Sequence, residues 1–429
     1  MKRLYRPIAW LLLCAAAALM LLCPAGNVDQ RREAAIRARY GGFSGVLRLW
    51  TCEALSPLSG WLNGRIAAFE KRHGGVYIQL TEVDEAALKD FSSGRAKPPD
   101  MLLFPPGMIE ETTFLAPLED DYPLRAGLER CGALDEARYA LPIAMDTYGV
   151  AYNRALLGTL PADWSALSER PAASKSFKKQ AESHWLNWPR DTDTQSWSAA
   201  LIALFSGAVN SEATRQRAPA GEELELDLGL SLPSDPTQAP TEAPRADKLI
   251  ENRLPNVLPD SFRRDASVYA PFTRASLAAM PVTQREIRRL TALSDSGKAP
   301  DWAVGAPGAA FTDQIALIAV TDCARTALSE RQALCREFAA SLLTEDAQQA
   351  LSTARALPVI DTPPLYAGEN GLSALESSLS GKTIAAPPAF DNAWRERAAA
   401  QADRMVAGDI TPQAAWDALK DTLNAGGAP

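Results

Sequence analysis

Hydrophobic residues in the first third of the chain alternate between strand spacing and helix spacing. Residues 45–50 alternate as in a core strand, and apolar positions from Leu58 to Phe69 recur at helical intervals. Further strands are predicted at 76–83 and 101–104. Strands that alternate with helices predict a largely parallel sheet, with ligands bound at the carboxyl ends of its strands.

Residues 140–157 are the most informative stretch of the pattern. A run of small, apolar and polar residues passes through Gly149 and ends at Asn153, which is a good helix cap. We interpret this run as a strand that crosses into a new unit. A second alternating run at 311–320 follows after a long interruption. A chain that leaves one unit and later returns to it predicts a two-lobed binding protein.

The interruption between these runs includes a segment of low complexity. Residues 214–253 repeat Pro, Glu, Asp and Ser and contain no aromatic residue. Such a composition cannot bury enough apolar area to order itself. We therefore expect a flexible excursion there.

Composition agrees with a globular protein of two domains. The chain has 429 residues, of which 47% are hydrophobic and 22% charged, so it can bury two cores. Its net charge of -8 argues against a nucleic-acid partner, because phosphate backbones require a basic surface.

The N-terminus predicts export. Lys2, Arg3 and Arg6 precede an uncharged apolar stretch at 8–23. This stretch is shorter than the roughly 20 residues of a spanning helix, which favours a cleavable signal peptide within residues 1–26 over a permanent anchor. Cys23 ends the stretch as in a bacterial lipoprotein acceptor site, although the preceding leucine is bulkier than such sites prefer. The protein is expected to be extracytoplasmic, either secreted or tethered to the outer face of the cytoplasmic membrane.

Four cysteines remain after the leader, in a compartment that permits disulfides. Cys323 and Cys335 are the best candidate pair, and burial as small hydrophobic residues is the alternative for them. Burial is favoured for Cys52 and Cys131. Zinc is not expected, because the spacing contains no CxxC element and the chain has only two histidines.

The sequence offers little evidence of catalysis. It contains no GxSxG elbow, no HExxH and no GxxxxGK[ST] phosphate loop. Paired acids for glycoside hydrolysis remain as the weaker alternative of an extracytoplasmic hydrolase. We expect a binding protein without a cofactor or a metal.

The order and spacing of eight stretches resemble the extracellular solute-binding proteins of ABC importers, in particular the family 1 type cluster that includes maltose-binding protein. The resemblance covers most of the mature chain. The stretches are LRLWT, FEKRHGGVYIQL, PPDMLLF, FLAPLED, ALPIAMDTYGVAYNRALLG, FTDQIALIAV, REFAASLLTEDAQQALSTARALPV and MVAGDITPQAAWDALKDTLN.

This resemblance implies an α/β, two-lobed periplasmic-binding-protein-like fold, with each lobe a mainly parallel sheet flanked by helices and with a hinge of several crossings. Lobe 1 would comprise 44–145 and 309–358, and lobe 2 would comprise 146–308 and 359–429, which includes 214–253. A ligand that touches both lobes would shift the population toward a closed state. The implied partners are a small solute, with sugar favoured, and an ABC permease in the membrane, and we expect a monomer.

Candidate ligand contacts lie at strand ends, on the crossings and in a loop rich in tryptophan. Most candidates also have a structural interpretation: helix capping for Glu53, ordinary turns for Pro105 and Gly107, hinge roles for Asp146 and Tyr148, and core packing for the tryptophans. The candidates are Thr51, Glu53, Pro105, Gly107, Asp146, Tyr148, Trp188, Trp197, Tyr269 and Asp313.

The identity of the ligand stays open at this point. A sugar is favoured by the resemblance and by tryptophans beside polar residues. A polyamine or another cation would instead use Glu53 and Asp146 as charge partners, and a ferric site would need tyrosines together with carboxylates. The protein could also present its ligand to a membrane sensor.

Overall fold

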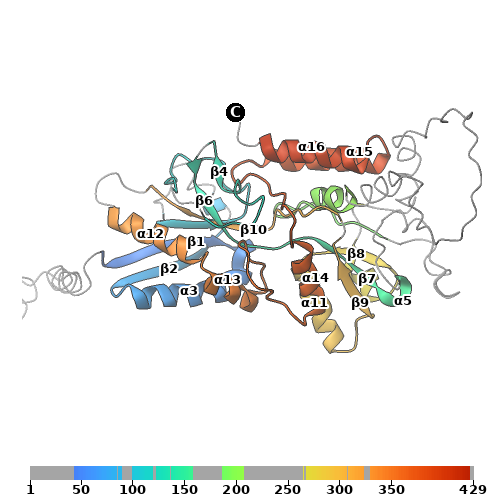
Figure 1. Cartoon of the computed structure of the whole chain (residues 1–429), viewed down its shortest axis with the longest axis horizontal. Coiled ribbons are helices and arrows are strands. Elements are labelled where there is room, and N and C mark those ends of the chain that lie inside the picture. The colour runs from blue at the N-terminus through green and yellow to red at the C-terminus, as the bar shows by residue number, and fades with distance from the viewer. Residues whose placement is uncertain are drawn as a thin grey trace, which may run out of the picture.

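The computed structural model describes most of the chain after residue 42, and it forms two lobes that each contain a sheet (Figure 1). The described residues are 43–84, 86–88, 99–118, 122–135, 137–157, 186–206, 264, 267–306, 308–322 and 329–425. The predicted leader with Cys23, the 214–253 excursion and Cys323 lie outside these ranges. Within them, no helix is long and apolar enough to cross a membrane.

The sheet of lobe 1 has five strands. Strands β1, β2 and β3 are parallel, and β10 runs antiparallel between β3 and β6. Every residue of β3, β6 and β10 is buried, which explains their continuous apolar sequences. In spatial order the strands are β2 (Val76–Val83), β1 (Gly45–Cys52), β3 (Met101–Phe104), β10 (Ile315–Val320) and β6 (Ala140–Met145).

Helices cover this sheet. α3 (Ser59–Arg72) buries Trp61, Leu62, Ile66 and Phe69, which are spaced so that they share one face. The helix follows the 3-10 turn η1 (Glu53–Leu58) and packs against η3 (Ala350–Ala354), which follows α13 (Glu345–Gln349). α12 (Ser329–Ser341) packs against β10.

The sheet of lobe 2 differs from the mainly parallel sheet that was expected. Its three described strands have the order β8 (Ala279–Val282), β7 (Gly149–Asn153) and β9 (Trp302–Gly305), and β7 is antiparallel to both neighbours. β8 and β9 are joined by α11 (Gln284–Asp295) and therefore run in the same direction, as in a crossover unit. β7 enters between β8 and β9 directly from lobe 1, and its direction is opposite to that of both strands.

The chain passes between the sheets at three places. β6 continues into β7 through residues 146–148, and β9 continues into β10 through residues 306–314. A third passage joins η3 to α14 (Asn370–Ser378), which packs against β9 and α11. Hydrogen bonds tie the passages together: the backbone N–H of Asp146 donates to the carbonyl of Gln314 at 2.7 Å, and Met145 pairs with Leu357.

The last two helices, α15 (Ala393–Ala407) and α16 (Pro412–Ala425), lie together along the upper side of the molecule (Figure 1). With the helix at 197–206 they form a second core that contains Trp394, Trp416 and Leu419. Gly408 ends α15 in the left-handed conformation, and the Thr411 hydroxyl accepts a hydrogen bond from the Ala414 N–H at the start of α16.

Short strands β4 (Ala133–Leu134) and β5 (Ala137–Arg138) form a separate ribbon near β6, and α5 (Arg154–Leu157) and α10 (Tyr269–Thr273) are single turns. The two sheets and their crossings position the site described next.

Candidate functional site

An open cleft of about 680 Å³ lies where the two lobes meet. Its walls come from η1 on lobe 1 and from the first residues of α11 on lobe 2, and Asp146, Asp313 and Gln314 contribute from the crossings. The volume falls within the range of ordinary small-molecule sites. A molecule held here touches elements of both sheets.

Asp146 connects the first crossing to the start of α11. Its carboxylate accepts the backbone N–H of Gln284 at 3.0 and 3.2 Å to its two oxygens, and Oδ1 also accepts the N–H of Thr147 at 2.6 Å. Burial raises the pKa of Asp146 to about 7, although these hydrogen bonds oppose the shift. Near neutral pH this group therefore exists in both protonation states.

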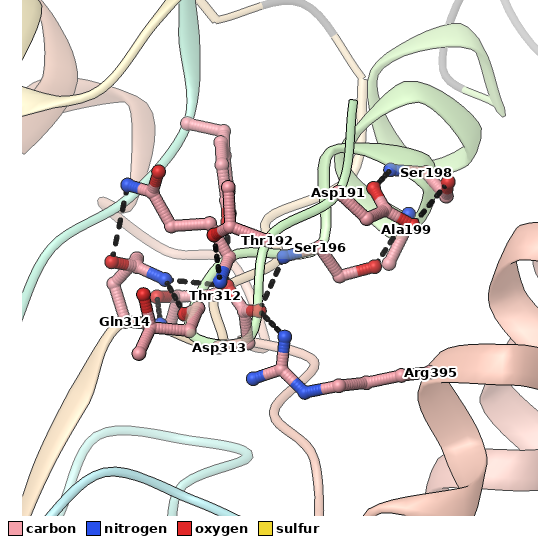
Figure 2. A network of polar contacts seen from close by, with 12 residues as sticks. Asp191, Thr192, Ser196, Ser198, Ala199, Thr312, Asp313, Gln314 and Arg395 are labelled. Carbon is pink, nitrogen blue, oxygen red and sulfur yellow. Dashed lines mark hydrogen bonds and ion pairs between the residues drawn. The ribbon is translucent and has the colours of Figure 1, made fainter. Parts of the chain in front are cut away.

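Asp313 is the centre of a buried polar network on the second crossing (Figure 2). Its Oδ1 accepts the hydroxyl of Tyr148 at 2.6 Å, and its Oδ2 accepts the backbone N–H of Ser196 at 2.7 Å. Arg395 of α15 places a guanidinium nitrogen 3.3 Å from Oδ2. The network joins both crossings, the 186–196 loop and α15, and burial beside Asp313 raises the pKa of Tyr148 well above its ordinary value.

Amide and hydroxyl groups extend from this network into the cleft. The side-chain Nε2 of Gln314 donates to the Thr194 carbonyl at 2.6 Å and to Asp313 at 3.1 Å. Gln195 reaches the Gln314 Oε1 atom at 3.3 Å, and both Gln195 and Thr194 line the cleft. This side of the cleft therefore presents groups that form hydrogen bonds with a polar solute.

Four of the residues proposed from the sequence lie together in the cleft, namely Glu53, Pro105, Asp146 and Asp313. Thr51 is buried within β1 and is not part of the cleft lining. Gly107 also lies outside the lining: it adopts a left-handed turn, with a φ of 79°, against Asn392.

Tyr148 and the two tryptophans belong to the core of lobe 2. Tyr148 is only 3% exposed and packs edge-to-face on Trp197, with ring centroids 5.1 Å apart. Trp188 is 0% exposed and donates its Nε1–H to the Trp197 carbonyl at 2.6 Å. These rings therefore present no open face on which a sugar could stack.

The loop between the tryptophans explains this placement. Asp191 accepts the N–H and hydroxyl of Ser198 at 2.7 and 2.6 Å, so the loop caps the helix at 197–206 and packs its aromatic residues inward. Tyr269 is also outside the cleft lining, and the Arg289 guanidinium lies 3.9 Å from the centre of its ring.

Sequence reasoning missed the contribution of α11. Gln284, Arg285 and Arg288 all line the cleft. The signal was present as a capping box, since Thr283 and Glu286 satisfy each other's backbone groups at the start of a helix that directly follows a buried strand. A helix start at a strand's carboxyl end is a frequent position for ligand contacts.

The described residues contain no group of three His, Cys, Asp or Glu side chains that could hold a metal ion. Cys335 is buried, but its proposed disulfide partner is not described, so that pairing stays a prediction.

Solved structures with the same fold are numerous. One is a cyclic alpha-maltosyl-1,6-maltose binding protein from Arthrobacter globiformis, with a TM-score of 0.60 and 12% identity over 90% of this chain and 99% of that one. Another is the sugar-binding protein MalE from Xanthomonas citri, with a TM-score of 0.57 and 14% identity over 90% and 98%. The GacH receptor of Streptomyces glaucescens aligns with a TM-score of 0.52 and 17% identity over 89% and 99%.

Sequence comparison gives the family. No curated protein matches the chain significantly. The family described as bacterial extracellular solute-binding protein, however, matches residues 64–365, which is well over half of the chain. On this evidence the chain belongs to the bacterial extracellular solute-binding proteins.

Proposed function

We propose that this protein captures a carbohydrate in the cleft between its lobes and delivers it to an ABC permease. The observation that carries the proposal is the cleft itself, because its walls come from η1 of lobe 1 and α11 of lobe 2 and residues of the crossings also line it. A ligand in such a site makes its full set of contacts only when the lobes close. Binding energy therefore shifts the population toward a closed shape that a membrane partner can recognise.

The polar groups of the cleft support a carbohydrate. Asp146 offers carboxylate oxygens, while Gln314, Gln195 and Thr194 supply amide and hydroxyl groups, and this mixture of donors and acceptors suits sugar hydroxyls. Proteins with the same fold are described as binding cyclic alpha-maltosyl-1,6-maltose, cyclo/maltodextrin or sugar. No aromatic residue lines the cleft among the described residues, so recognition would depend on hydrogen bonds rather than on ring stacking.

A receptor role accounts for the site without a reaction step. We propose that the chain is a monomeric, non-catalytic binding protein, and that the segment at 1–26 directs export and is then cleaved or lipidated at Cys23. Mass spectrometry of the native N-terminus distinguishes a cleaved, a lipidated and an intact leader. As an alternative to delivery to a permease, the protein would present its ligand to a membrane sensor, which would recognise the same closed state.

A polyamine is the second candidate, because Glu53 and Asp146 both line the cleft. The wall of lobe 2 opposes this ligand, since Arg285 and Arg288 place two cations in the same cleft. Like charges would repel a polyamine there. The carbohydrate proposal is therefore preferred.

A thermal-shift screen tests the proposal, because a ligand that binds only the folded state raises the melting temperature. The screen compares monosaccharides, maltose and maltotriose with putrescine and metal salts. At least one sugar should raise the melting temperature, and the Gln314→Ala variant should weaken that response. A shift with putrescine and none with any sugar would reject the carbohydrate assignment.

Small-angle scattering on the same samples tests the closure step. The radius of gyration should fall when the sugar that gives the shift is added. A sugar that stabilises the protein without compacting it would contradict capture between the lobes.

A further inference from the structure

The first turns of α11 place two positive charges in the cleft that form no ion pair with the described residues. Arg285 is exposed and Arg288 is half-buried, and both line the cleft. Residues three apart on a helix lie on neighbouring parts of one face. Neither guanidinium makes an ion pair or hydrogen bond with another of the residues that the structure describes, although the charge of Arg288 acts on Asp146 at longer range.

Glu286 of the same helix and two carboxylates of the cleft lining, Asp146 and Asp313, already have partners. Glu286 accepts hydrogen bonds from the N–H and the hydroxyl of Thr283 at 3.0 and 2.7 Å. Asp146 accepts the Gln284 and Thr147 N–H groups, and Asp313 is held by Tyr148, Ser196 and Arg395. The remaining carboxylate of the lining, Glu53, belongs to η1 on the other lobe.

Gln284 supplies an independent observation. This residue lines the cleft and is only 3% exposed, and its Nε2 has no hydrogen-bond partner among the described residues. A buried donor without a partner is unfavourable, so an acceptor at this position would be stabilising. The same helix start therefore combines two free guanidinium groups with an unsatisfied amide donor.

Building on the proposed function, we propose that the natural ligand is a saccharide with an anionic group, either a uronate carboxylate or a phosphate ester, which binds at Arg285, Arg288 and Gln284. Guanidinium groups pair with both kinds of anion through parallel, charge-assisted hydrogen bonds. The neutral part of the sugar would meet Gln314 and Gln195 deeper in the cleft. The arginines would then determine specificity within the sugar class.

Calorimetric titration of matched ligand pairs tests this inference. Digalacturonate is compared with galactobiose, and glucose 6-phosphate with glucose, so that the two sources of negative charge are separated. The acidic member of one pair should bind at least tenfold more tightly than its neutral counterpart. Raising the ionic strength from about 0.02 M to about 0.5 M should weaken the acidic ligand selectively, because salt screens exposed charges.

Variants of α11 assign the effect to the named residues. The double variant R285Q/R288Q should lose the preference for the acidic ligand, so that the dissociation constants of the acidic and the neutral member of the pair agree within about twofold. The matched control is Arg289→Gln, since Arg289 lies on the same helix but contacts Tyr269 instead of the cleft. Melting curves without ligand confirm that each variant is folded.

The outcomes separate this inference from the proposed function. Equal affinity for acidic and neutral members of both pairs, or a preference that survives in R285Q/R288Q, overturns the anionic ligand and leaves a receptor for neutral sugars. Failure of every saccharide, acidic or neutral, rejects both proposals.

Discussion

The carboxylate of Asp146 accepts the backbone N–H of Gln284, 138 residues further along the chain, at 3.0 and 3.2 Å. This contact joins the crossing between the sheets to the first residue of α11. It also holds together two parts of the cleft lining, because both residues face the same open space. Any change in the charge of Asp146 therefore acts on the hinge and on the ligand wall together.

Asp146 should make stability depend on pH. Its folded pKa of about 7 lies above its ordinary value of 3.8, so the folded state retains a proton that the unfolded state loses. The free energy of unfolding should therefore fall as the pH rises from about 4 to 7, by at most about 4 kcal/mol and by less because the carboxylate is partly open to solvent. The Asp146→Asn variant should show a smaller fall, measured by urea unfolding at pH 5 and pH 8. Identical pH profiles for the two proteins would contradict the assignment.

The buried network around Asp313 should be essential for stability. In Asp313→Asn, Arg395 loses its charge partner in a site where Asp313 is fully buried, and breaking such a pair costs about 3–5 kcal/mol. Tyr148→Phe removes one hydrogen bond and should cost about 1–3 kcal/mol. Urea unfolding of both single variants and the double variant gives the coupling energy. Strict additivity would mean that the two side chains act independently.

The tryptophans should matter for stability rather than for affinity. Trp188→Phe shrinks a fully buried side chain and removes the hydrogen bond to the Trp197 carbonyl, so unfolding should become easier by about 1–3 kcal/mol. The dissociation constant of the sugar found in the screen should change by less than about twofold, as the ring lies outside the cleft lining. Thermal unfolding measures the change in stability, and calorimetric titration measures the change in the dissociation constant. A large loss of affinity in a variant that stays folded would restore Trp188 as a ligand contact.

Gly107 should be required for its backbone conformation. It has a φ of 79°, and a Cβ atom there would lie 2.8 Å from the Asn392 side-chain oxygen. Gly408 has a similar φ of 81° but open space around it, which makes it a matched control. Gly408→Ala should cost about 1 kcal/mol from the left-handed conformation alone, and Gly107→Ala should cost more. The comparison uses thermal unfolding, and equal losses would show that Asn392 moves aside freely.

The strands and helices that bury one apolar face could be predicted from the sequence. The strand at 76–83 and the helix covering 58–69 appear as β2 and α3, because period and burial are local properties of the chain. The resemblance to extracellular solute-binding proteins is confirmed by the family match. Glu53, Pro105, Asp146 and Asp313 lie in the cleft because strand ends and crossings converge in this architecture, and their role as ligand contacts stays a prediction.

Only the tertiary structure decided the direction of β7, the burial of Trp188 and Trp197, and the position of Arg285 and Arg288 in the cleft. An aromatic residue beside polar ones has the same sequence pattern whether its ring faces the core or a cleft. Contacts such as Tyr148 with Asp313 join residues 165 positions apart. Local periodicity therefore determined the elements, whereas long-range packing between the lobes determined which side chains form the site.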